Sequence, residues 1–85
     1  MPTQTVVVGS SVGLHARPAA IISEAAGDLD SEVFIGLPGE EPVDAGSSLL
    51  IMTIGAGNGD TVEVSGDDEA AVTAIAALVA QDLDA

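Results

Sequence analysis

The sequence has no cysteine, no tryptophan, no tyrosine and a single phenylalanine, Phe34. Without cysteine, neither disulfide bonds nor a thiolate metal site can stabilise the fold. A core without large aromatic rings must be built from Ala, Val, Ile and Leu, and hydrophobic residues make up 47% of the chain. That apolar content excludes an intrinsically disordered chain. We expect one domain over residues 1–85, because a chain of 85 residues provides a core just large enough for one.

Positive charge is almost absent as well. Arg17 is the only basic side chain beside fourteen Asp and Glu, and the formal net charge at pH 7 is −13. Such a chain repels nucleic acid phosphates and anionic lipid, and it has no basic patch to hold them. No apolar run approaches membrane-spanning length, and no signal peptide pattern precedes the first strand. We therefore expect a cytoplasmic protein that neither binds nucleic acid nor inserts into a membrane, with an acidity that favours solubility or adaptation to a salty cytoplasm.

The spacing of apolar residues and of glycine and proline predicts the element order β-α-β-β-α-β-α. Pro18 is tolerated only in the first turn of its helix, and Gly27 is expected as the C-cap of that helix. Strands are expected at about residues 4–8, 31–37, around Val43 and around 62–64, and helices at about residues 16–26, 48–54 and within 67–83.

This order predicts an α+β fold, an open-faced two-layer β-sandwich in which a four-stranded antiparallel sheet carries three helices on one face. Val33 and Ile35 should face the helices while Phe34 points the other way, because side chains alternate along a strand. In the last helix a recurring apolar stripe should face the sheet. That stripe consists of Val72, Ile75, Ala76 and Val79.

The stretch GLHARPAA, residues 13–20, places the single histidine, His15, two residues before the single arginine, Arg17. His15 stands at the expected start of a helix, where the first N–H groups have no acceptor within the helix and the dipole is positive. Pro18 has no N–H, so those of Ala16 and Arg17 are left to bind an anion. Imidazole is a nucleophile suited to reversible phosphoryl chemistry near neutral pH. The stretch therefore suggests a phosphoryl group carried on His15.

Other interpretations of these residues stay open at this level. A histidine at a helix start is often only a surface or capping residue. A metal site is weaker, since one histidine and scattered carboxylates lack ligand spacing. A hydrolase triad built on Ser10 or Ser11 with His15 is weaker still, because no orienting partner is visible.

GLHARPAA resembles the phosphohistidine site of the HPr family, the small phosphocarriers of the phosphoenolpyruvate:sugar phosphotransferase system. The stretch SSLLIMTIGAGNGDTVEVSG, residues 47–66, resembles the family's second signature. By this resemblance, His15 would be phosphorylated on Nδ1 by Enzyme I, Arg17 would stabilise the phosphoryl group, and Ser47 would match a serine that a regulatory kinase phosphorylates in part of the family. The resemblance further implies a monomer without cofactor or metal. Such a protein is a carrier between Enzyme I and Enzyme II (EIIA) proteins, with a serine kinase or phosphatase as a further partner, rather than a free-standing enzyme.

Two departures from the family pattern matter. Members usually carry Lys and Arg around the active-site face, whereas this chain has no lysine and has Glu24 in the first helix. Docking must then depend on apolar contacts, for which Leu14, Leu49 and Met52 are candidates. For each of the three, the alternative to docking is packing in the core. Two adjacent serines, Ser47 and Ser48, leave the regulatory position open, and at least one of them is expected to cap a helix.

Several functions fit these features. The first is the sugar phosphocarrier, which passes phosphate from phosphoenolpyruvate through His15 to sugar uptake. Carriers in a nitrogen-linked system or a dihydroxyacetone kinase relay share the same features. A regulatory binding module acting through Ser47 would not need His15 and Arg17, and a protein without chemistry leaves their pairing unexplained.

Overall fold

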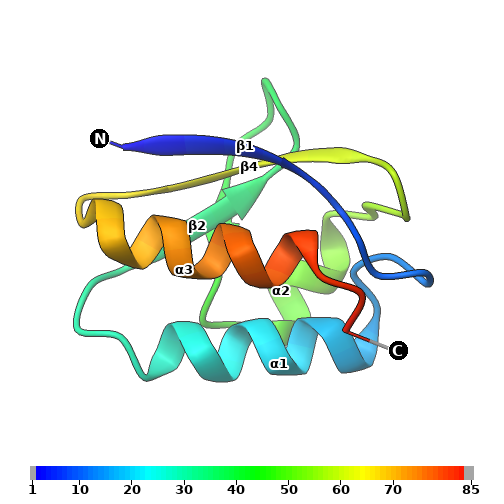
Figure 1. Cartoon of the computed structure of the whole chain (residues 1–85), viewed down its shortest axis with the longest axis horizontal. Coiled ribbons are helices and arrows are strands. Elements are labelled where there is room, and N and C mark those ends of the chain that lie inside the picture. Colours follow the sequence, from blue (N-terminus) through cyan, green and yellow to red (C-terminus); the bar gives the residue numbers. More distant parts are fainter. Residues whose placement is uncertain (1, 84–85) are drawn as a thin grey trace.

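The computed structural model describes residues 2–83, and it has the predicted order of elements (Figure 1). The fold prediction is confirmed: an antiparallel four-stranded sheet carries the helices. The strands are β1 (Thr3–Val7), β2 (Val33–Gly36), β3 (Val43–Asp44) and β4 (Thr61–Gly66), and the helices are α1 (Ala16–Gly27), α2 (Ser48–Thr53) and α3 (Glu69–Ala80).

The strand order in the sheet is β1-β4-β2-β3, and every neighbouring pair is antiparallel. Val62 and Val64 of β4 and Val33 and Ile35 of β2 are buried, as the alternation predicts. Phe34 is only half-buried, so the other face of the sheet is left open. One face of the sheet therefore forms the core with the helices.

The helices form the second layer of the molecule (Figure 1). α3 packs on β1 and β4, and α1 packs against both α2 and α3. The predicted apolar stripe of α3 is buried, from Val72 to Val79. Three consecutive acidic residues, Asp67 to Glu69, stand at the start of α3, and Asp68 caps the helix by accepting the N–H of Ala70 at 3.0 Å. Within residues 2–83, no helix is both long and apolar enough to cross a membrane.

The ends of two helices differ from the sequence expectation. α1 includes Gly27 and ends there, and its C-cap residue is Asp28, in a right-handed conformation. The N–H of Asp28 reaches the carbonyls of Glu24 and Ala25, each at 3.2 Å. The helix thus closes by a tightened turn that needs no left-handed glycine, so the assignment of Gly27 as the cap was wrong. α3 ends at Ala80, because Gln81 is extended.

α2 begins as expected, after a serine cap. Ser47 is the N-cap residue, and its Oγ accepts the N–H of Leu50 at 3.3 Å. Ser48 is the first helical residue and is half-buried. The capping role expected for one of the two serines therefore belongs to Ser47.

Candidate functional site

His15 occupies the N-cap position of α1. Its backbone is extended, with φ −86° and ψ −168°, and its side chain makes no capping hydrogen bond to the helix. The carbonyl of His15 accepts the N–H of Ala19 at 2.9 Å and so starts the hydrogen-bond ladder of α1. The residue is exposed at the start of the helix.

The two N–H groups that follow His15 have no acceptor within residues 2–83. These belong to Ala16 and Arg17, and the third residue of the helix is Pro18, which has no N–H. The first turn of a twelve-residue helix therefore presents unpaired donors at its positive end. An anion bonded to the ring of His15 would lie beside these donors.

Arg17 is the second exposed side chain of the site. Within the described part of the chain, its guanidinium makes no hydrogen bond or ion pair, although the sequence has fourteen acidic residues. The fold therefore does not use the charge of Arg17. A planar guanidinium can donate two parallel hydrogen bonds to a phosphoryl group, which makes Arg17 a suitable partner for one carried on His15.

The loop that leads into His15 is held by its backbone. The N–H of Gly13 donates to the carbonyl of Ser10 at 3.0 Å and closes a turn, in which Gly13 has a φ of +76°. The next residue, Leu14, donates its N–H to the carbonyl of Ala56 at 2.9 Å. A turn with a glycine in the left-handed region, followed by an anchored residue, fixes the direction in which the chain enters α1.

Leu14 is only 3% exposed and belongs to the core, so it is not a docking residue. The alternative of core packing is correct for this residue. Leu49 and Met52, the other two docking candidates, are exposed, by 68% and 38%. Their α2 helix packs beside α1, the helix that His15 begins.

Sequence reasoning missed three further exposed apolar residues, of which Val7, at the end of β1, is 55% exposed. Leu50 is 40% exposed, and Val12, in the loop before His15, is 50% exposed. In the run Leu49 to Met52, only Ile51 is buried, because a helix of six residues turns one side chain in four toward the core. The shortness of the helix indicates that four consecutive large side chains cannot all be buried, but it does not indicate which of them are exposed.

We define the apolar patch of α2 as Leu49, Leu50 and Met52. Ser47, the N-cap residue of α2, stands two residues before Leu49 in the sequence, so a modification of Ser47 would add its charge at the start of the helix that carries the patch. Glu24 is exposed on α1. No group of three or more potential metal ligands is present within residues 2–83, so the described residues offer no clustered metal site.

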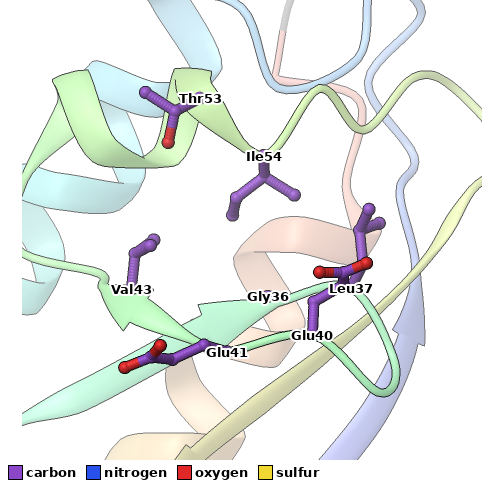
Figure 2. A pocket seen from close by; sticks show the side chains of 7 residues that line it. All are labelled: Gly36, Leu37, Glu40, Glu41, Val43, Thr53 and Ile54. Atoms are coloured by element: carbon purple, nitrogen blue, oxygen red, sulfur yellow. The ribbon is translucent and has the colours of Figure 1, made fainter.

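The structure also has a hollow of about 360 Å³ away from the candidate site, between the β2–β3 turn and the end of α2 (Figure 2). Neither His15 nor Arg17 lines it. Its lining residues are Gly36, Leu37, Glu40, Glu41, Val43, Thr53 and Ile54. His15 and Arg17 are instead exposed at the start of α1.

Comparisons with known proteins give matches over nearly the whole chain. Residues 2–81 match the family model described as the PTS HPr component phosphorylation site. The chain is 38% identical to the phosphocarrier protein HPr of Streptomyces coelicolor, with 99% of this chain and 94% of that protein covered. It is 36% identical to the phosphocarrier protein NPr of Shewanella violacea, over 87% of this chain and 84% of that one. The crystal structure of HPr-C-His from Thermoanaerobacter tengcongensis matches with a TM-score of 0.87 and 30% identity, covering 100% of this chain and 98% of the other.

Proposed function

Because this chain belongs to the HPr family of phosphocarrier proteins, we propose that His15 is the residue that carries its phosphoryl group. The observation that supports this most strongly is the place of His15 at the start of α1, directly before the unpaired N–H groups of Ala16 and Arg17. His15 is also the only histidine of the chain. A phosphohistidine in this protein can form nowhere else.

The proposed reaction has two steps. His15 first accepts one phosphoryl group from a donor and then passes the same group to an acceptor. The lone pair on Nδ1 of neutral His15 attacks the phosphorus of the phosphorylated donor, the new N–P bond forms, and the bond between phosphorus and the donor breaks. In the second step a nucleophilic atom of the acceptor attacks the same phosphorus, a new bond forms between them, and the N–P bond breaks to return neutral His15. In this proposal the phosphoryl group arrives from one protein and leaves to another, so the chain acts as a carrier between them and not as a free-standing enzyme.

Arg17 and the first turn of α1 supply the charge compensation in this proposal. The phosphoryl oxygens would accept hydrogen bonds from the backbone N–H groups of Ala16 and Arg17 and from the guanidinium of Arg17. These donors are held in place before the reaction, and such preorganised donors stabilise charge that develops in the transition state.

The family has partners in the phosphotransferase system, Enzyme I on the donor side and EIIA on the acceptor side. We extend this to a cytoplasmic monomer that docks through the apolar patch of α2. A serine kinase acting at Ser47 is a further proposal, supported by the place of the half-buried Ser47 at the start of α2, two residues before that patch. No cofactor is required for the transfer.

A related donor system is the second candidate, since relatives named NPr occur beside those named HPr at similar identity. The experiment that tests the proposal incubates the protein with phosphoenolpyruvate and Enzyme I, and locates the phosphate by mass spectrometry and by nitrogen NMR of the ring. We expect one phosphoryl group on Nδ1 of His15. Running the same reaction with the Enzyme I paralogue of a nitrogen-linked system shows which donor charges the protein faster.

A further inference from the structure

Ser10 lies in the loop that leads into His15. It is 1% exposed, and it is the one buried polar residue within residues 2–83. Its hydroxyl donates to the carbonyl of Gln81 at 3.3 Å and accepts the N–H of Leu83, also at 3.3 Å. Both hydrogen-bonding roles of the hydroxyl are therefore used to join the loop before α1 to the segment after α3, seventy-one residues further along the chain.

The residues on either side of Ser10 approach the same end of α3. The N–H of Gly9 donates to the carbonyl of Val79 at 3.0 Å, and a Cβ on Gly9 would lie 2.0 Å from the carbonyl oxygen of Ala80. The N–H of Ser11 donates to Oδ1 of Asp82 at 3.3 Å. The loop thus lies directly against the C-terminal end of α3.

A second set of contacts holds the loop from the other side. Nδ2 of Asn58 donates to the carbonyl of Ser10 at 3.1 Å and to that of Gly9 at 3.4 Å. The carbonyl of Ser10 also accepts the N–H of Gly13, and Leu14 is anchored on Ala56. Ser10 is therefore hydrogen-bonded both to the segment that follows α3 and to Asn58 in the segment before β4.

We propose that Ser10 is a positioning residue for phosphoryl transfer: its buried hydroxyl fixes the loop of residues 9–14 and thereby the place of the His15 ring relative to the N–H groups of Ala16 and Arg17. This inference rests on the proposed role of His15. Phosphoryl transfer depends on alignment of the attacking atom, and misplacing a reacting group by about 1 Å costs roughly a hundredfold in rate. Ser10 acts only through the loop, since its hydroxyl is bonded to Gln81 and Leu83.

The chain offers a matched control for the test, since Ser11 is the next residue and is exposed. Its side chain makes no hydrogen bond within residues 2–83, and its contact with Asp82 uses the backbone N–H, which Ser11→Ala keeps. We would compare the wild type, Ser10→Ala and Ser11→Ala at a temperature at which circular dichroism shows all three to be folded. The readouts are the kcat and KM of charging by phosphoenolpyruvate and Enzyme I, and the NMR signals of the uncharged His15 ring.

Ser10→Ala should lower kcat about ten- to a hundredfold, with KM unchanged because the apolar patch of α2 is intact, and it should shift or broaden the His15 ring signals. Ser11→Ala should match the wild type in all three. A folded Ser10→Ala with wild-type kcat and ring signals overturns the proposal, as does a rise in KM alone.

If Ser10→Ala does not fold, Ser10→Cys provides the test, because a thiol is nearly isosteric and hydrogen-bonds only weakly. A reduced kcat in folded Ser10→Cys supports the proposal and a wild-type kcat overturns it. The ring signals are measured without phosphate. If the wild type itself is never charged on His15, the proposed function fails, while the ring signals still show whether Ser10 positions His15.

Discussion

The N–H of Leu14 donates a hydrogen bond to the carbonyl of Ala56 across 2.9 Å. This bond joins the residue before His15 to the segment between α2 and β4, and so connects the two stretches by which the sequence resembles its family. Gly13, one residue earlier, lies against the same segment: a Cβ there would be 2.6 Å from the carbonyl oxygen of Ala56. The second stretch therefore supports the first, in addition to carrying α2.

Two glycine substitutions test how much this close approach contributes to stability. Gly13→Ala should lower the free energy of unfolding by more than about 1 kcal/mol, because the residue has a φ of +76° and its Cβ would meet backbone. Gly27→Ala should instead raise it by up to about 1 kcal/mol, since Gly27 is helical and nothing lies within 4 Å of a Cβ there. Denaturant unfolding of both variants measures the difference. Equal effects would contradict the close packing of the loop.

The transfer step should depend on the shape of Arg17 and not only on its charge. Arg17→Lys keeps the charge but loses the planar pair of donors, so transfer to and from His15 should slow by roughly 5- to 150-fold, equivalent to about 1–3 kcal/mol. The fold should be unaffected, because the guanidinium has no partner within residues 2–83. Rapid-quench kinetics with Enzyme I measures the rate. Wild-type transfer in this variant would mean that the N-terminus of α1 suffices alone.

Docking should depend on the apolar patch of α2. Leu49→Asp or Met52→Asp should raise the KM for the protein in charging by Enzyme I, because a charge must then be buried against an apolar partner surface. Ala77→Asp adds the same charge at an exposed position of α3 and is the matched control, and Glu24→Gln removes one from α1. Both should change KM little.

The same account predicts a weak dependence of this KM on salt, since Arg17 is the only Lys or Arg of the chain and there is no basic area to screen. A steep loss of affinity between low and physiological salt would contradict apolar docking. It would indicate a basic partner surface facing the carboxylates of this chain.

Ser47 and Ser48 should respond differently to a negative charge. Ser47→Asp keeps a side chain that caps α2, so the thermal midpoint should stay near that of the wild type, while the charge beside the patch slows charging of His15. Ser47→Ala removes the cap and should cost about 1 kcal/mol in stability without slowing charging. Thermal unfolding and charging assays on both variants, with Ser48→Asp for comparison, separate the two roles. If Ser47→Asp is charged as fast as the wild type, the serine is only a cap.

The strands, the helices and their buried faces were predictable because each follows a local pattern, such as the alternation of Val33, Phe34 and Ile35 or the acidic start of α3. Pro18 placed the start of α1, and therefore His15, within one residue. Leu50 and Ser10 were not predictable in the same way. Whether Leu50 is covered depends on which elements lie beside a helix of one and a half turns, and Ser10 is buried by residues seventy-one positions away. Neither relationship leaves a periodic signal in the chain.

The end of α1 shows a smaller limit of sequence patterns. A glycine near the end of a helix usually indicates a left-handed cap, yet Gly27 is helical and Asp28 closes the turn. The pattern predicted the position of the end to within one residue. It did not predict the backbone conformation at the end of the helix, because a right-handed and a left-handed cap residue can both satisfy the last carbonyl groups of a helix.

The central claim, that His15 carries the phosphoryl group, is tested most directly by charging wild type and His15→Ala side by side with phosphoenolpyruvate and Enzyme I and measuring the intact mass before and after acid. A phosphoryl group on an imidazole nitrogen is lost in acid and survives base, unlike a serine ester. We expect the wild type to gain one acid-labile phosphoryl group and His15→Ala, which has no other histidine, to gain none. An acid-labile phosphoryl group on His15→Ala, or none on the folded wild type with an active donor, would contradict the account.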